Sequence, residues 1–269
     1  AKLDSANFEE LWQMAQGHNL TALTAKALSA TKAFQSAPDE ERKRWTNTLN
    51  NSIKKTMLFD AERKSILSYF EKNGIWYLPL KGAVINRLYP SYGTREFADN
   101  DILIDPDRMA DAKDFMLKRG YTFRSDEFAA DEYSKAPFFN IEIHRMLVEQ
   151  TTALEQFYEY YKDVKSRLVK ESGNTCGYRF TDEDFYIYFI FHAFKHYDGR
   201  GTGFRTVADE YVVLHSDFFH LDFKVIESEL RELGLLTFER KLRNLADTLF
   251  SQPEKTWENI SRLSREDRD

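Results

Sequence analysis

The chain has 269 residues, of which 42% are hydrophobic and 30% are charged, a balance that excludes a disordered chain. Its 38 basic and 44 acidic residues give a net charge of −6, which disfavours nucleic acid as the main partner. The sequence shows no apolar run of membrane-spanning length and no apolar stretch at its start, so we expect no membrane partner. The single cysteine, Cys176, excludes an internal disulfide and favours a cytoplasmic location.

Residues 1–72 are predicted to form an N-terminal helical segment. Apolar residues recur there at helical spacing in two stretches, with Pro38 marking the break between them. Gly74 is expected to end the second stretch.

Residues 73–148 are predicted to form a small α/β core. Its expected elements, in chain order, are a strand at 75–80, a helix at 83–88, a strand at 101–104, a helix at 107–119 and a strand at 138–144. The fourth element has an acidic start and a basic end, which suits the helix dipole.

Residues 149–269 are predicted to form a C-terminal helical domain. Its expected helices are 184–197, 204–214, 223–233 and 237–250. The charged tail from Ser251 is expected to fray. The predicted fold class is therefore α+β, a small mixed sheet with helices, flanked by N-terminal helices and a C-terminal helical domain.

Two acids, Asp99 and Asp101, lie one residue apart at the start of an apolar strand. Side chains alternate along a strand, so both are expected to point the same way, and they repel each other unless a cation lies between them. Mg²⁺ takes oxygen ligands of this kind and keeps positions free for phosphates. With Glu142 from the third strand, the pair predicts a metal site for phosphoryl or nucleotidyl transfer. The alternative is a turn at Asp99 and a solvated strand edge at Asp101.

The residues before the acid pair suit phosphate. Lys81 would neutralise triphosphate charge, and the amides around Gly82 would bind phosphate oxygens at the start of the next helix. A turn glycine beside a solvated lysine is the alternative. Arg95 would hold a phosphate with its fork of donors, or form a salt bridge to a nearby acid such as Glu96 or Asp99.

Two histidines, His192 and His196, share one face of a predicted helix. A zinc site is disfavoured, because Ala193 stands where a zinc protease of this spacing has glutamate and no third ligand is evident. These two histidines are expected to line a cleft between the α/β core and the C-terminal helices or to satisfy core hydrogen bonds. His144 is expected to be structural, and its nearness to Glu142 makes a role beside the metal ligands or toward the substrate the alternative. Arg205 and Asp209 lie one helical turn apart, so an intrahelical ion pair is the default interpretation.

The motifs of the core carry a resemblance to a known family. They are Leu80-Lys81-Gly82-Ala83, Tyr89-Pro90, Arg95, Asp99-Asn100-Asp101-Ile102-Leu103-Ile104 and Ile141-Glu142-Ile143-His144. In this order they resemble an uncharacterised nucleotidyltransferase family of the DNA-polymerase-β-like superfamily, which includes many antibiotic and small-molecule nucleotidyltransferases. The superfamily's usual glycine-serine turn is replaced here by Lys81-Gly82.

The resemblance implies that a nucleoside monophosphate moves from an NTP, such as ATP, to an acceptor, while pyrophosphate leaves. Asp99, Asp101 and Glu142 would bind Mg²⁺, or Mn²⁺ in its place, and Glu142 would take the acceptor's proton. Lys81, Gly82 and Arg95 would hold the triphosphate. By resemblance alone, Arg205 and Asp209 would close the cleft over nucleotide or acceptor. The acidic charge favours a small-molecule acceptor over RNA.

A non-catalytic function is the alternative, as a nucleotide-binding or toxin–antitoxin-type interaction module. The retention of all three acids argues against it, because unpaired acids are costly to keep.

Overall fold

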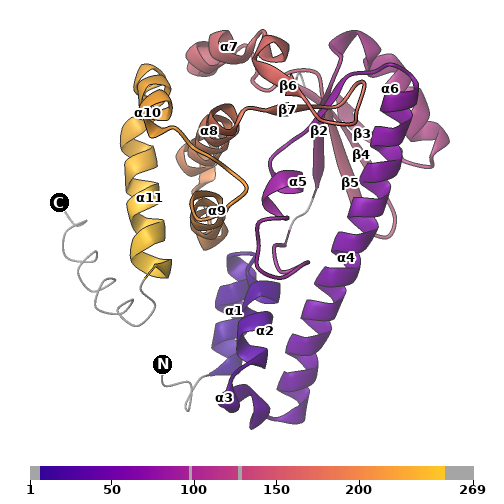
Figure 1. Cartoon of the computed structure of the whole chain (residues 1–269). Helices are drawn as coiled ribbons and strands as arrows, with labels where there is room; N and C mark the ends of the chain where they lie inside the picture. The colour runs from indigo at the N-terminus through magenta and orange to yellow at the C-terminus, as the bar shows by residue number, and fades with distance from the viewer. Residues whose placement is uncertain (1–6, 97–98, 127–128, 252–269) are drawn as a thin grey trace. The chain divides into compact units, whose positions relative to one another are not determined.

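The computed structural model describes residues 7–96, 99–126 and 129–251 (Figure 1). They fold as two compact units. The sheet unit comprises Lys54–Arg87 and Phe97–Phe185, and the helical unit comprises Ala1–Ile53, Leu88–Glu96 and Tyr186–Asp269. The predicted segments 1–72, 73–148 and 149–269 divide the chain by sequence order. The two units instead group residues that contact one another, so each unit combines parts of more than one predicted segment. The tail expected to fray lies outside the described residues beyond Ser251.

The sheet unit contains a mixed sheet of five strands, which confirms the predicted α+β class. In spatial order the strands are β1 (Tyr77–Pro79), β2 (Asn100–Ile104), β5 (Phe139–His144), β4 (Ala130–Lys135) and β3 (Thr122–Asp126). The β2 and β5 strands run parallel, and the other neighbours run antiparallel. The three predicted strands are confirmed as β1, β2 and β5.

Helices cover one face of this sheet. The helices of the sheet unit are the second half of α4 (Asp39–Lys72), α5 (Gly82–Ile85), α6 (Met109–Lys118) and α7 (Glu155–Tyr161), with short 3-10 turns at Pro106–Arg108, Thr152–Leu154 and Val164–Arg167. Ile66 of α4 and Met116 of α6 pack in one core with Ile102 and Ile143 of the sheet. Because side chains alternate along a strand, the residues between these apolar positions face the other way. The unit also carries a hairpin of β6 (Leu168–Lys170) and β7 (Tyr178–Phe180).

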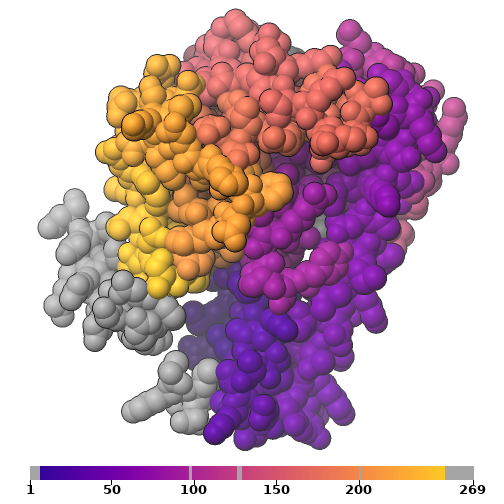
Figure 2. All heavy atoms as spheres, in the orientation of Figure 1, coloured from indigo at the N-terminus to yellow at the C-terminus, as the bar shows by residue number. Residues whose placement is uncertain are grey.

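The helical unit is built from segments far apart in sequence. Its helices are α1 (Phe8–Gly17), α2 (Thr21–Ser29), α3 (Lys32–Gln35), the first half of α4, most of α8 (Asp182–Arg200), α9 (Phe204–Leu214), α10 (Phe223–Glu232) and α11 (Leu236–Phe250). Helices α10 and α11 lie side by side, as the orange and yellow surface of Figure 2 shows. The four predicted C-terminal helices and the break at Pro38 are confirmed. No helix in the described part of the chain is long and apolar enough to cross a membrane.

The segment 88–96 is held in the helical unit by specific contacts. Glu96 accepts hydrogen bonds from the backbone N and the hydroxyl of Thr21, at 2.9 and 2.6 Å. Gly93 has a φ of +75°, and a Cβ there would lie 2.7 Å from the Cα of Ile53. This position therefore requires glycine, both for its backbone conformation and for the close approach of α4.

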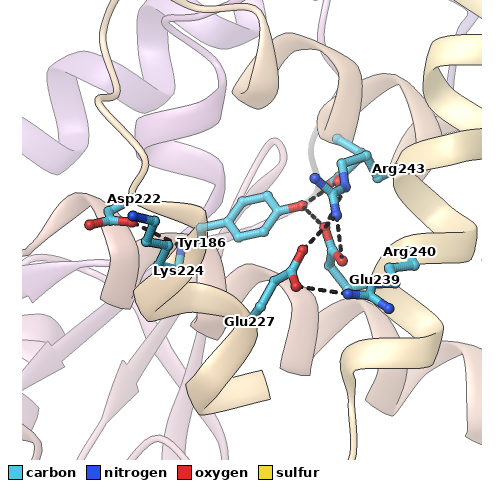
Figure 3. A network of polar contacts seen from close by, with 8 residues as sticks. Tyr186, Asp222, Lys224, Glu227, Glu239, Arg240 and Arg243 are labelled. Carbon is cyan, nitrogen blue, oxygen red and sulfur yellow. Dashed lines mark hydrogen bonds and ion pairs between the residues drawn. The ribbon is translucent and has the colours of Figure 1, made fainter. Parts of the chain in front are cut away.

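A buried polar network joins α8, α9 and α11 in the helical unit (Figure 3). The hydroxyl of Tyr186 lies 2.6 Å from Glu210 Oε1 and 3.0 Å from Glu239 Oε1. Arg243 forms an ion pair with Glu239, with Nε 2.9 Å from Oε1, and its Nη2 donates to Oε2 at 3.4 Å. Among the described residues, Glu210 Oε2 has no hydrogen-bond partner. Burial raises the pKa of Glu210 to about 8; the Tyr186 contact opposes this rise and the nearby Glu239 adds to it. Glu210 is therefore an acid that the native protein holds protonated at neutral pH.

We expect Glu210→Gln to stabilise the protein increasingly as the pH rises. In the unfolded chain this acid loses its proton near 4.5, whereas the native state keeps it until about pH 8. Between these two pH values the native state binds more protons than the unfolded chain. The contribution of Glu210 to the free energy of unfolding is therefore fully present below pH 4.5 and falls as the pH rises towards 8. Glutamine mimics the neutral acid and does not titrate, so the variant escapes this loss. Its stability should gain on that of wild type by at most about 1.4 kcal/mol per pH unit.

Urea unfolding from pH 5 to pH 8 measures this effect. The control Glu232→Gln changes the same charge at an exposed position of α10 and should follow wild type at every pH. Parallel stability curves for Glu210→Gln and wild type would contradict the assignment of a protonated Glu210.

Candidate metal centre

The pairing of β2 with β5 brings two predicted acids together. In the parallel register, Asp101 is opposite Glu142 and Leu103 is opposite His144. The neighbours Ile102 and Ile143 point into the core, so the polar side chains lie on the other face of the sheet. Asp101, Glu142 and His144 each offer one ligand atom, and these atoms all lie within 4.8 Å of one another. The sheet thus builds a group of three potential metal ligands.

Asp99 is not a member of this group among the described residues. Strand β2 begins at Asn100, so Asp99 directly precedes it, and the shared direction of the Asp99 and Asp101 side chains stays a prediction. His144 stands in its place in the group. The signal for His144 was present in the sequence, because a residue two positions after Glu142 on a strand shares its face.

Lys81 and His144 contact the carboxylates of this group. Lys81 Nζ is 3.3 Å from Asp101 Oδ2, and His144 Nε2 is 3.5 Å from Asp101 Oδ1 and 3.4 Å from Glu142 Oε2. The side chains of Lys81, Asp101 and His144 are only 14%, 11% and 14% exposed. Burial lowers the pKa of His144, but contacts with Asp101 and Glu142 outweigh it, so the pKa is raised overall. Without a metal, these groups offset the repulsion between the acids.

The backbone at Lys81 has an unusual conformation. Its φ is +21°, a region that residues with a side chain rarely adopt. The carbonyl of Lys81 accepts hydrogen bonds from Val84 N and Ile85 N, both at 2.9 Å, which fix this turn at the start of α5. Helix α5 ends at Ile85, earlier than the predicted 83–88. Backbone strain of this kind often accompanies functional sites.

The donor set fits a hard divalent cation. Carboxylate oxygens are the ligands that Mg²⁺ and Mn²⁺ prefer, and Asp101 and Glu142 supply them from adjacent strands. An imidazole is a less favoured ligand for these ions, so His144 suits a position beside the carboxylates better than a share in an all-oxygen shell.

Arg95 and Asp209 form a buried ion pair in the helical unit. Arg95 Nε and Nη2 donate to the two carboxylate oxygens of Asp209 at 2.7 and 2.9 Å, and Tyr89 OH donates to Oδ1 at 2.8 Å. An Arg205–Asp209 ion pair, the default interpretation, is not among the contacts of the described residues: Asp209 pairs with Arg95, and Arg205 Nη1 donates to the carbonyl of Glu96 at 2.9 Å. The role of Arg95 in nucleotide binding stays a prediction, and the structure adds a partner that sequence spacing did not indicate.

The histidines of α8 contact each other. The Nε2 atoms of His192 and His196 are 3.0 Å apart, and the two rings meet edge to face. Within the described residues, neither histidine belongs to a group of three potential metal ligands. His192, Arg205 and Asp209 belong to the helical unit, so their predicted place in a cleft stays a prediction.

Comparison with known proteins identifies the family. No curated protein matches the chain. Among solved structures, it resembles the antibiotic-resistance factor ANT(2'')-Ia with 9% identity and a TM-score of 0.42, over 65% of this chain and 88% of that one. It also resembles an antigenic nucleotidyltransferase-like protein from Paracoccidioides brasiliensis with 16% identity and a TM-score of 0.37, over 66% and 87%. Residues 4–251 match a family described as "Uncharacterised nucleotidyltransferase", and the chain therefore belongs to this nucleotidyltransferase family.

Proposed function

We propose that the protein transfers a nucleoside monophosphate from an NTP, with ATP as the first candidate, to a hydroxyl of a small molecule. The observation that carries the proposal is the pairing of Asp101 with Glu142, beside His144, on the sheet face opposite the Ile102 and Ile143 side chains of a nucleotidyltransferase-family protein. A reducing, cytoplasmic setting belongs to the proposal, because Cys176 is the only cysteine.

The metal would be held by Asp101 and Glu142, with Asp99 as the further ligand proposed from the sequence. A bound Mg²⁺ or Mn²⁺ would neutralise triphosphate charge and stabilise the attacking and leaving oxygens. Lys81, now 3.3 Å from Asp101, would turn from this carboxylate to the triphosphate. Gly82 would let the backbone approach the phosphates, and Arg95 would add positive charge.

The transfer itself is a displacement at the α-phosphorus. The acceptor hydroxyl oxygen forms the new bond to phosphorus, the bond to the β-phosphate's bridging oxygen breaks, and pyrophosphate leaves with that electron pair. Glu142, 33% exposed and in contact with His144, would accept the hydroxyl proton. His144, His192, Arg205 and Asp209 are the residues proposed to line the cleft for nucleotide and acceptor.

We expect Glu142→Gln to weaken the metal-dependent binding of NTP by about 10–100-fold, because the variant loses a charged ligand. Calorimetry with each NTP, in Mg²⁺ and in EDTA, measures this without knowledge of the acceptor. Glu132→Gln is the matched control, because Glu132 lies directly opposite Glu142 in the β4–β5 register but outside the group of three. Equal NTP binding in EDTA and Mg²⁺, or equal damage by the two variants, would contradict the proposed site.

A further inference from the structure

The sheet unit contains a cleft of about 550 Å³ that none of the metal-centre residues Lys81, Asp101, Glu142 and His144 lines. Its walls come from the second half of α4, from Tyr77 of β1 and from the β6–β7 hairpin. In Figure 1, the upper part of α4 and this hairpin lie next to each other. The volume is within the range of small-molecule sites.

The cations of this cleft exceed its acids. Arg63, Lys64, Lys72 and Arg87 line it together with Asp60 and Glu71. Both acids are engaged within the protein: Asp60 pairs with Arg63, and the Glu71 carboxylate accepts hydrogen bonds from the backbone N of Thr175 and Cys176.

The remaining cations have no such partners. Across the part of the chain that the structure describes, Lys64, Lys72 and Arg87 form no ion pair. The cleft therefore presents uncompensated positive charge, which attracts anions.

The Arg63 wall of this cleft contains a buried polar contact. The Arg63 side chain is 9% exposed, and its Nη1 donates to Asn100 Oδ1 at 2.8 Å. Asn100 is 3% exposed, and its Nδ2 has no hydrogen-bond partner among the described residues. Asn100 alternates with Asp101 along β2, so the Arg63 contact lies on the opposite face of the sheet from the metal centre.

The spacing of the lysines selects the ligand. Lys64 and Lys72 are eight residues apart on α4, so their Cα atoms lie about 12 Å apart along the helix and about 80° apart around it. Both residues line the cleft. Linked phosphates can lie along the helix, so that different phosphates of one anion meet the two ammonium groups. We propose that this cleft is a second binding site, for an anion with several linked phosphate groups, and that it works without a metal ion.

Inorganic tripolyphosphate in EDTA is the probe for this site. Calorimetry with the full chain should show binding that Lys64→Ala with Lys72→Ala weakens at least tenfold. The control pair Lys54→Ala with Lys118→Ala removes the same charge from exposed helical positions that do not line the cleft, and should bind like wild type. Asp101→Asn should also bind like wild type, which separates this site from the metal centre.

Three results would overturn the inference. If calorimetry detects no binding of tripolyphosphate at millimolar concentration, the cleft is not such a site. Equal weakening by both lysine pairs shows general charge attraction only. A clear change of tripolyphosphate affinity in Asp101→Asn, in either direction, places the probe at the metal centre, where loss of this carboxylate releases Lys81. None of these readouts depends on nucleotidyl transfer, so failure here and failure of the proposed function are distinguishable.

Discussion

Asp101→Asn is expected to reduce nucleotidyl transfer by at least about 10²–10³-fold, the cost typical of losing a single group that stabilises transition-state charge. Asparagine keeps the size of the side chain and the backbone of β2, but it loses the charge that a divalent ion requires. Asp101 is opposite Glu142 in the sheet, so its loss leaves the metal with one carboxylate of the pair.

The fold of Asp101→Asn should survive with a modest loss of stability. Two adjacent acids repel, so sequence alone predicts a variant that is as stable as wild type or more so. The structure changes this expectation, because Lys81 and His144 already lie against Asp101 and offset the repulsion. Asparagine can still accept one hydrogen bond, so we expect a loss of about 1 kcal/mol in the absence of metal.

Thermal melts with and without Mg²⁺ complete this test. Mg²⁺ should stabilise wild type and the control Asp107→Asn, which removes the same charge at an exposed position, but not Asp101→Asn. A variant that Mg²⁺ stabilises as much as wild type would show that the metal binds elsewhere.

The sequence predicted those parts of the fold whose pattern is local. Residues 100–104 and 139–144 carry apolar positions at strand spacing, and both are strands. The strands β3 and β4 were missed, because Thr122–Asp126 and Ala130–Lys135 are mostly polar and resemble loops. Their pairing with β5 comes from the tertiary fold, which overrides such weak local preference.

The candidate site likewise has features that a local sequence pattern predicts and features that only the tertiary fold sets. The proximity of Asp101 and Glu142 was predictable, since both flank apolar strand positions that must face one core. The contact of Lys81 with Asp101 goes with a backbone φ of +21° at Lys81, and no pattern of residue types predicts that conformation. The bond of Arg95 to Asp209 joins residues 114 positions apart, so no local spacing indicates it.

Asp209→Ala is expected to destabilise the protein by about 3–5 kcal/mol, because it leaves the Arg95 charge buried without its carboxylate. The two side chains are only 7% and 6% exposed. Tyr89 also loses the acceptor of its hydroxyl, which lies 2.8 Å from Asp209 Oδ1. Urea unfolding measures the loss, and Asp198→Ala, an exposed acid of α8, should change the stability little.

The double variant Arg95→Met with Asp209→Leu separates the ion pair from simple loss of packing. Replacing both charges with apolar side chains leaves no buried charge, so this variant should lose less stability than Asp209→Ala alone. If it loses as much as Asp209→Ala, packing rather than the unpaired charge accounts for the loss. If Asp209→Ala is no more harmful than Asp198→Ala, the Arg95–Asp209 bond does not hold the segment 88–96 against α9.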